Sequence, residues 1–311
     1  MISGFLSELG KKFAERWFTL LVLPGALYLA VATAARTLGH CHALDVPYLA
    51  RRITDWAASP DADTVGGQVV LLAGVLGGSA TAGILAQALG ATVERTALAA
   101  GWRDLRCTWL RERVAGRVDA RRARWTTAAR AWHRQQAALI TARSLRRPVD
   151  NTAVLAARRT MDAIALESPD RPTWCGDRLN AVAVRLRRDL GFDLAVCWPG
   201  LWLTLPDTDR DALTEARRAV ERATALAAWA VLYTPLVVWW WPALPLGLTL
   251  ALLSRRRTRA ATDAYAQLTE AVSRLHLRAL GDHLGLDPTV PAHELGPLIT
   301  ARLEPSGPPR P

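Results

Sequence analysis

The sequence predicts an all-α integral membrane protein with two N-terminal spans, a helical cytoplasmic region, a C-terminal transmembrane hairpin and an amphipathic C-terminal helix. Three observations predict this fold class. Three long blocks lack any charged residue, apolar residues elsewhere recur at steps of three and four, and arginines are concentrated between the second and third blocks. Half of the 311 residues are hydrophobic although the net charge is +11, so apolar and basic residues occupy separate segments.

The first two uncharged blocks each supply one predicted membrane span. Residues 17–35 form an uncharged block of 19 residues and residues 64–93 form one of 30. A helix needs about 20 apolar residues to cross the hydrocarbon core, so we expect crossings at 17–35 and 69–89. The first block is longer than the apolar core of a cleaved signal peptide. Residues 2–13 have the helical spacing of an amphipathic segment on the membrane surface, which completes a predicted domain of residues 1–93.

Charge asymmetry predicts the orientation of these spans. The loop 36–63 carries three basic and four acidic residues, whereas the segment that follows the second span is rich in arginine. By the positive-inside rule, the loop faces out and residues 94–222 are cytoplasmic. We therefore expect a multi-pass protein of the cytoplasmic (inner) membrane with both termini in the cytoplasm.

The third block, residues 223–254, has 32 uncharged residues between two arginine-rich flanks. Both flanks are predicted to be cytoplasmic, so we interpret the block as a hairpin with legs 223–240 and 246–253 and a turn at 241–245. The turn places three indoles at the far interface, where indoles are favoured: Trp239, Trp240 and Trp241. Each leg is short for a span, so the legs either extend into the flanking amphipathic helices or form a re-entrant hairpin. A single helix broken at its prolines is the alternative.

Small residues recur every four positions along the second predicted span. They are Gly74, Gly78, Ala82, Ala86 and Gly90. Such a stripe lets a second helix backbone approach closely. The partner is either another span of the same chain or a second copy of the protein.

The cytoplasmic segment begins with an arginine-rich helical stretch. Residues 101–147 contain 13 arginines and three acidic residues, a net charge of +10. Between Gly90 and Pro148 there is no proline and only two glycines, which predicts either one long helix or a break near Gly116 or Arg121.

We expect the charge on this stretch to contact the anionic inner leaflet, because each basic residue near that surface contributes about 1 kcal/mol. A partner protein is the second alternative. Nucleic acid is the least favoured, since no nucleic-acid-binding motif accompanies the arginines. The predicted lipid contacts are Arg103, Arg106, Arg111, Arg113, Arg117, Trp102 and Trp109.

A second cytoplasmic segment, residues 172–206, predicts a small packing module. Its candidate packing residues are Trp174, Gly176, Asp177, Trp198, Pro199 and Trp202. Trp198 and Trp202 are four apart and share a helix face. Asp177 either caps the following helix or pairs with Arg178 or Arg185.

The stretch Gly176-Asp177-Arg178-Leu179-Asn180-Ala181, followed by Trp198-Pro199-Gly200-Leu201-Trp202-Leu203-Thr204-Leu205-Pro206, resembles a family of uncharacterised bacterial (actinobacterial-type) multi-pass membrane proteins. The resemblance covers roughly residues 171–253. It implies the multi-pass architecture and no particular chemistry.

Residues 255–303 after the hairpin predict cytoplasmic amphipathic helices. Apolar residues at steps of three and four form a coiled-coil-like seam: Tyr265, Leu268, Val272, Leu275 and Ala279. The helix is expected to stop at Gly285 and Pro288. The proline-rich tail, residues 304–311, is expected to be disordered.

No motif in the sequence predicts an enzyme, a cofactor or a metal site. The four cysteines, Cys41, Cys107, Cys175 and Cys197, form no CxxC pair, and His40-Cys41-His42 lacks a fourth ligand. Phosphate-binding, hydrolase and dinucleotide motifs are missing. The expected crossings contain no ionisable residue, which argues against an ion-coupled transporter.

These features predict a non-enzymatic membrane protein that acts by self-assembly, in one version as an oligomeric channel or pore-type effector with a cytoplasmic sensing region. The alternative is a membrane scaffold that recruits a soluble partner protein to the inner leaflet. The predicted partners are therefore the lipid bilayer with its anionic lipids, and either a second copy or a partner protein.

Overall fold

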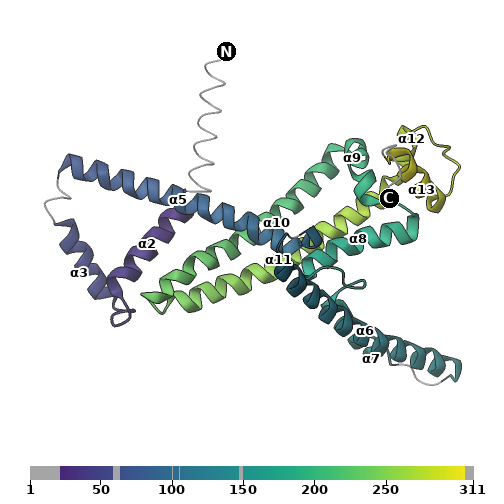
Figure 1. Cartoon of the computed structure of the whole chain (residues 1–311), viewed down its shortest axis with the longest axis horizontal. Coiled ribbons are helices and arrows are strands. Elements are labelled where there is room, and N and C mark those ends of the chain that lie inside the picture. The colour runs from purple at the N-terminus through teal and green to yellow at the C-terminus, as the bar shows by residue number, and fades with distance from the viewer. Residues whose placement is uncertain (1–21, 59–63, 100, 105, 147–149, 305–311) are drawn as a thin grey trace, which may run out of the picture. The chain divides into compact units, whose positions relative to one another are not determined.

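The computed structural model describes residues 22–58, 64–99, 101–104, 106–146 and 150–304, and within these ranges the chain is helical and has no strand (Figure 1). The α-helices are α2 (Leu23–Leu38), α3 (Val46–Ala57), α5 (Val65–Leu98), α6 (Thr108–Ser144), α7 (Thr152–Ile164), α8 (Trp174–Leu190), α9 (Leu194–Thr204), α10 (Asp207–Tyr233), α11 (Ala243–Leu275), α12 (Leu277–His283) and α13 (Ala292–Leu303). Two 3-10 helices are η2 (Trp102–Asp104) and η3 (Thr234–Val238). The predicted surface helix 2–13, the start of the first predicted span and the tail 305–311 lie outside the described residues.

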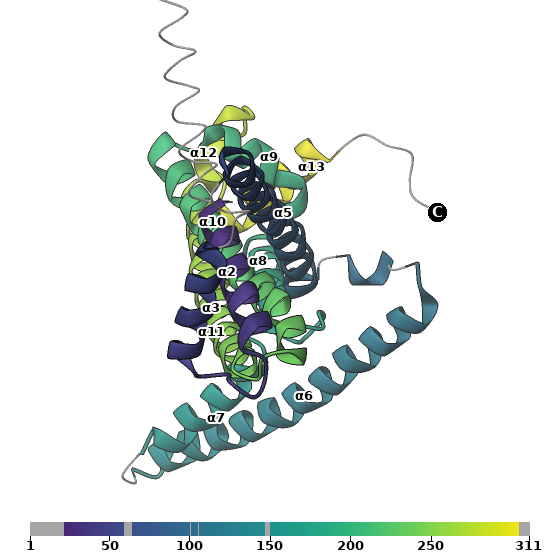
Figure 2. The same ribbon diagram turned by 90° about the vertical axis from the view of Figure 1, so that its left-hand side faces the viewer.

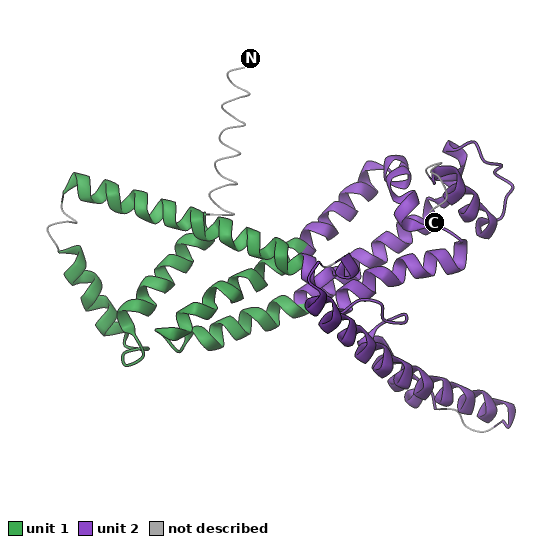
Figure 3. Cartoon of the chain, in the orientation of Figure 1, with its two compact units in different colours: residues 1–94, 221–256 green, residues 95–220, 257–311 purple. Residues whose placement is uncertain are grey.

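The chain folds into two compact units (Figure 3). Unit 1 comprises residues 1–94 and 221–256, and unit 2 comprises residues 95–220 and 257–311. The boundary falls inside three continuous helices, α5, α10 and α11.

Among the described helices, α5 alone is both long enough and apolar enough to cross a membrane. Its 34 residues include the predicted crossing 69–89. Helices α2 and α9 are also apolar but shorter. Because the described residues form helices and no strands, the all-helical part of the predicted fold class is confirmed.

The third uncharged block forms a helical hairpin in unit 1. The first leg ends at Tyr233, seven residues earlier than predicted, and continues as η3, where Pro235 supplies no backbone N–H to an α-helix. The second leg starts at Ala243. Ser254 Oγ donates to the carbonyl of Ala223 at 2.7 Å, which places the two legs side by side. A single broken helix is therefore wrong, and both legs continue into the flanking polar helices.

Helix α2 packs against this hairpin through its aromatic and small residues. Tyr28 donates a hydrogen bond to the carbonyl of Leu232 at 3.2 Å, and its ring meets the Tyr233 ring edge-on at 5.5 Å. At the hairpin turn, Trp240 Nε1 donates to the carbonyl of Ala43 at 2.7 Å. Its neighbours Trp239 and Trp241 are exposed. The three indoles therefore share the turn but differ in environment.

The small-residue stripe of α5 faces its own chain along most of its length. A Cβ added to Gly78 would meet the Leu29 side chain of α2 at 2.9 Å, and one added to Gly90 would meet Ala225 of α10 at 3.6 Å. Ala82 and Ala86 between them are buried. Gly74 differs, because nothing lies within 4 Å of the position its Cβ would take. Four of the five stripe positions are thus inside unit 1.

The stretch between Gly90 and Pro148 is divided at a position that neither sequence alternative predicted. Helix α5 runs on to Leu98, and α6 then continues from Thr108 without a break at Gly116 or Arg121. The chain turns between them at Ala99, whose φ of 43° lies in the left-handed region. The sequence around Ala99 has no proline, so local pattern alone does not indicate this break.

Helices α6 and α7 pair as an antiparallel hairpin in unit 2 (Figures 1 and 2). Val118 and Ala129 of α6 and Met161 of α7 are its buried residues. The spacing of Val154, Met161 and Ile164 predicts a helix over 151–166, and α7 follows this prediction closely.

Helices α8, α9, α12 and α13 and the unit 2 parts of α10 and α11 enclose the main hydrophobic core. Fully buried large side chains include Leu186, Phe192, Leu201, Leu213 and Ile299. Helix α8 ends at Gly191, which adopts the left-handed conformation with φ 60°. Unit 2 therefore has the closed core of a globular domain.

The predicted C-terminal seam is only partly correct. Helix α11 ends at Leu275, which is 76% exposed, and the chain restarts as α12 after His276. Val272 is buried as expected, but the following core contacts come from Leu277 and Leu280 of the new helix. The break at His276 changes which residues face the core, so the prediction of one continuous apolar seam is wrong.

Candidate functional site

Asp177 lies at the centre of the predicted packing module and is 4% exposed. One carboxylate oxygen accepts from Arg121 Nη2 at 2.6 Å, and the other accepts from the backbone N–H groups of Asp170 and Arg171 at 2.8 and 2.7 Å. Arg121 also donates to the carbonyl of Ile164 at 2.8 Å. The carboxylate thereby fixes the loop between α7 and α8 against α6.

The partners predicted for Asp177, Arg178 and Arg185, are wrong. Arg178 pairs with Asp263 at 2.5 Å, and Arg185 pairs with Glu167 at 3.1 Å. Thr173 caps α8 instead, because its hydroxyl accepts from the Gly176 N–H at 3.1 Å. The true partner Arg121 is 56 residues away along the chain, a separation that helical spacing does not reach.

The same module satisfies carbonyl groups at the C-terminal end of α5, where helices leave backbone acceptors without partners. Arg171 Nη1 donates to the carbonyl of Ala99 at 3.1 Å, and the Thr173 hydroxyl donates to the carbonyl of Ala97. Gly176 lies so close that an added Cβ would be 2.5 Å from the carbonyl oxygen of Leu98. This glycine is therefore required by the close approach of the two helix ends.

Three indole N–H groups hold the last turn of α7 and the segment between α7 and α8. Trp102 donates to the carbonyl of Asp170, Trp125 to that of Ala165, and Trp174 to that of Asp162, at 3.0, 2.9 and 3.3 Å. Arg259 also covers the Trp174 ring, with its guanidinium carbon 4.5 Å from the ring centroid. These indoles act as structural anchors.

The remaining module residues lie in α9. Trp198 and Trp202 contact each other at a centroid distance of 5.9 Å and pack against the unit 2 core. Pro199 sits inside the helix and is exposed. The shared face predicted from their spacing is confirmed.

Cys175 of α8 has a free, buried thiol. Burial raises the pKa of this thiol, so it remains protonated at neutral pH.

The predicted lipid-contact residues fall into two groups. Trp102 and Arg103 both contact Asp170, Trp102 through its indole N–H and Arg103 through an ion pair of 2.5 Å, although the Arg103 side chain is 65% exposed. The second group is exposed and consists of Arg106, Arg111, Arg113, Arg117 and Trp109. Within it, the guanidinium of Arg113 covers the Trp109 ring at 5.6 Å.

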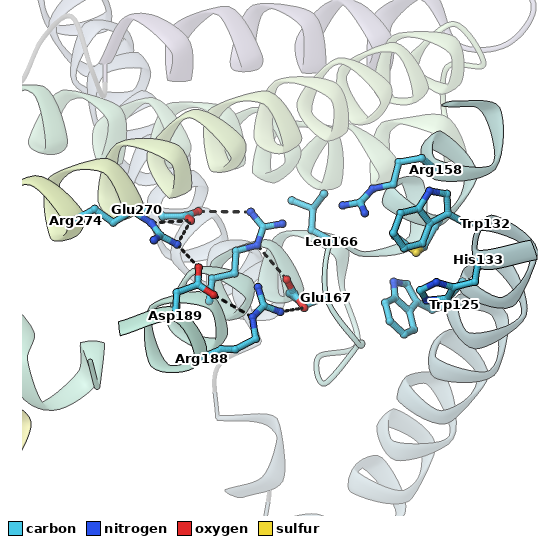
Figure 4. A pocket seen from close by; sticks show the side chains of 13 residues that line it. Trp125, Trp132, His133, Arg158, Leu166, Glu167, Arg188, Asp189, Glu270 and Arg274 are labelled. Atoms are coloured by element: carbon cyan, nitrogen blue, oxygen red, sulfur yellow. Dashed lines mark hydrogen bonds and ion pairs between the residues drawn. The ribbon is translucent and has the colours of Figure 1, made fainter. Parts of the chain in front are cut away.

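Unit 2 also contains a cleft of about 570 Å³ that the sequence did not predict (Figure 4). Helices α6, α7, α8 and α11 and the α7–α8 loop supply its lining. Figure 4 shows charged side chains on one side, aromatic side chains on the other, and Leu166 between them. The volume lies within the range of about 300–1,000 Å³ that is typical of small-molecule sites.

The charged side of the cleft is a connected network of three arginines and three carboxylates. Glu167 accepts from Arg185 at 3.1 Å and from Arg188 at 3.2 Å. Arg188 also pairs with Asp189 at 3.1 Å, and Arg274 pairs with Asp189 at 2.7 Å.

Glu270 closes this network by pairing with Arg274 at 3.1 Å and with Arg185 at 3.6 Å. The hydrogen bonds from Arg274 and then Arg188 lower the pKa of Asp189, and Asp189 in turn raises the pKa of both guanidinium groups. Asp189 and the guanidinium groups of Arg188 and Arg274 are therefore ionised at neutral pH.

The other side of the cleft is formed by Trp125, Trp132, His133 and Arg158. The Arg158 guanidinium covers the Trp132 ring at 4.9 Å, within the range of a cation–π contact. The rings of Trp132 and His133 are 4.6 Å apart. Planar side chains thus face the charged network across the cleft.

The described residues hold no cluster of His, Cys, Asp or Glu arranged for a metal ion. His40 contacts the carbonyl of Val238 at 2.9 Å, and His42 stacks on Tyr48 at 4.5 Å. Cys41 between them is exposed. The geometry around His40 and His42 is that of loop packing.

A partial sequence signal for the cleft did exist. Glu270 and Arg274 are four residues apart on one helix, a spacing at which opposite charges pair. Joining them to Glu167 and Asp189 requires knowledge of the tertiary fold. In comparisons with protein families, curated proteins and solved structures, no match to this chain was found.

Proposed function

We propose that the protein is a membrane-anchored scaffold, in which unit 1 is embedded in the bilayer and unit 2 is a cytoplasmic recognition domain. The observation that carries this proposal is the unequal exposure of apolar side chains. Unit 1 exposes many large ones, among them Val65, Val69, Val70, Leu72, Ile84, Leu85, Val238, Leu244, Leu248 and Leu252. Apolar side chains exposed in such number are typical of a membrane or protein interaction site.

Several features of α5 and the hairpin support membrane insertion. Helix α5 has the length and composition of a span. Trp239 and Trp241 are exposed at the hairpin turn, and indoles are favoured at a membrane interface. The exposed arginines at the start of α6 follow α5 by 8–19 residues, a distance at which basic residues orient a span and attract anionic headgroups.

The topology is tested with reporter fusions in cells. Fusions after residue 147 and after residue 259 should both report the cytoplasm, and a fusion within 46–57 should report the opposite side. Opposite sidedness of the first two fusions would eliminate the membrane hairpin. Recovery of the intact protein in the soluble fraction would overturn membrane insertion itself.

A second candidate function is self-assembly, which includes the oligomeric pore. It is favoured by one observation: Gly66, Gly74 and Gly77 of α5 have open space where a Cβ would lie. A helix from a second copy would approach closely there. The scaffold ranks first, because the other stripe positions contact the protein's own helices.

Two substitutions in α5 separate these candidates by mass measurement in detergent. Under self-assembly, Gly74→Leu reduces the oligomer mass and leaves the fold of each protomer intact. Gly78→Leu serves as the matched control, since it collides with Leu29 and should lower thermal stability. A monomeric wild-type protein would rule out the oligomeric candidate.

A further inference from the structure

We infer that the cleft in unit 2 binds a small anion that carries a planar ring, with a purine nucleotide as the representative of this class. The inference deepens the proposed function, on which it rests for the cytoplasmic location of unit 2. It assigns the recognition domain a small ligand in addition to any protein partner.

The first step concerns which hydrogen-bonding groups remain available in the cleft. All six carboxylate oxygens of Glu167, Asp189 and Glu270 already contact a guanidinium group. Each carboxylate oxygen of the network therefore already has a guanidinium partner within the protein.

The guanidinium donors that line the cleft are in surplus, because a guanidinium group has five N–H donors and no acceptor. Among the described residues, nothing accepts a hydrogen bond from Nη2 of Arg188, Nη1 of Arg274 or either Nη atom of Arg158. The Arg188 side chain is 58% exposed. The cleft is therefore suited to a ligand rich in acceptors.

Charge favours an anion only through these local donors. The four arginines that line the cleft are opposed by Glu167, Asp189 and Glu270, and Asp162 pairs with Arg158 at 3.0 Å. The site is close to neutral overall, so it does not attract polyanions through its net charge. Preorganised guanidinium groups bind a phosphate or carboxylate through directed, charge-assisted hydrogen bonds.

The second step concerns the aromatic side of the cleft, which lies opposite the charged network. Trp125, Trp132 and His133 provide planar apolar surface, and Arg158 extends it as a flat guanidinium over the Trp132 ring. Stacking of a base on such a surface contributes about 1–3 kcal/mol. A ring-bearing anion is the ligand class that uses both sides of a cleft of about 570 Å³.

The test is calorimetric titration of the intact protein in detergent with three probes: AMP, adenosine and inorganic phosphate. We expect one AMP per chain, and at least tenfold weaker binding of adenosine and of phosphate. If adenosine bound as tightly as AMP, the claim that the cleft recognises an anion would be wrong. If phosphate bound as tightly as AMP, the claim that it recognises a planar ring would be wrong. No heat from AMP at millimolar concentration would overturn it.

Variants locate the site. Arg188→Gln should weaken AMP at least tenfold, whereas Arg143→Gln on the exposed end of α6 should leave it unchanged. Because Arg188→Gln disturbs an ion-pair network, His133→Ala provides a second variant at an exposed ring with no hydrogen bond to any described residue. It should weaken AMP several-fold and leave phosphate binding unchanged. Unaltered AMP affinity in both variants would contradict the assignment.

These outcomes are separable from those that test the proposed function. The titration is made on purified protein and does not depend on topology. The reporter fusions do not depend on a ligand. A failure of the titration would therefore not contradict the membrane topology, and a failure of the fusions would not contradict ligand binding.

Discussion

The two units bury apolar surface in different ways. Unit 2 encloses Leu186, Phe192 and Leu201 completely, as a globular domain in water does. In unit 1, the buried positions of α5 are small residues such as Ala82 and Ala86, while its large side chains point outward. Helices in lipid pack through small residues, because lipid solvates large apolar side chains as well as a protein interior does. The contrast between small buried residues in α5 and large buried residues in unit 2 is the one expected if, as proposed, lipid surrounds unit 1 and water surrounds unit 2.

The largest effect should come from breaking the buried ion pair of unit 2. Asp177→Ala leaves the Arg121 guanidinium buried without its carboxylate, which costs about 3–5 kcal/mol. We expect a large drop in the thermal unfolding temperature of the purified protein. Asp119→Ala is the matched control, because this carboxylate is 73% exposed and 3.6 Å from Arg122. Similar unfolding temperatures for the two variants would show that Asp177 is not a structural anchor.

The next prediction compares the loss of stability on truncating one leucine in each unit. Leu186→Ala opens a cavity in the unit 2 core and should cost about 2–5 kcal/mol. Leu72→Ala in α5 removes a side chain that is 60% exposed and should change stability in detergent by less than about 0.5 kcal/mol. Thermal unfolding of both variants measures the difference. A large loss from Leu72→Ala would mean that α5 is buried in an assembly, which would favour the self-assembly candidate.

Glycine substitutions sharpen the comparison within unit 1. A Cβ on Gly25 would lie 2.0 Å from the carbonyl oxygen of Ser79, so Gly25→Ala must separate α2 from α5. Overpacking of this kind costs about 1–3 kcal/mol. Gly74→Ala meets nothing within 4 Å and should stabilise the helix by about 0.5–1 kcal/mol. If Gly25→Ala melts like the wild type, the close contact between α2 and α5 is wrong.

Local pattern predicted most of the helices but not the contacts that end them. The uncharged blocks and the three-and-four spacing identified α5, α7 and the hairpin, because burial imposes the helical period directly on the sequence. The break at Ala99 was missed, because its stabilising groups, Arg171 and Thr173, lie more than 70 residues further along the chain.

The candidate site shows the same limit more strongly. Trp174, Gly176 and Asp177 were singled out correctly as packing residues, yet the partner Arg121 was counted only as part of a basic stretch. Net charge of +10 over residues 101–147 does not distinguish an arginine buried against Asp177 from one exposed at the surface. Tertiary pairing of side chains on different helices is needed to separate them.

The smallest expected effect concerns the pH dependence of the cleft network. The pKa of Asp189 is lowered in the folded protein, first by Arg274 and then by Arg188. A carboxyl with a lowered folded pKa stabilises the fold above its unfolded pKa of about 3.9, and this contribution is lost as the pH falls through the folded pKa.

Replacing the carboxyl tests this sign. Asp189→Asn should lower the unfolding temperature slightly at pH 7. The variant should come closer to wild type as the pH falls below about 4, toward the lowered pKa at which the folded wild-type carboxyl takes up its proton. The difference should also shrink in high salt, because Asp189 and Arg274 are each more than one-third exposed and such pairs are screened by solvent. A difference between variant and wild type that is the same at pH 3 and pH 7 would mean that Asp189 acts through shape and hydrogen bonding. The network would then hold its arginines in place without depending on the ionisation of this carboxyl.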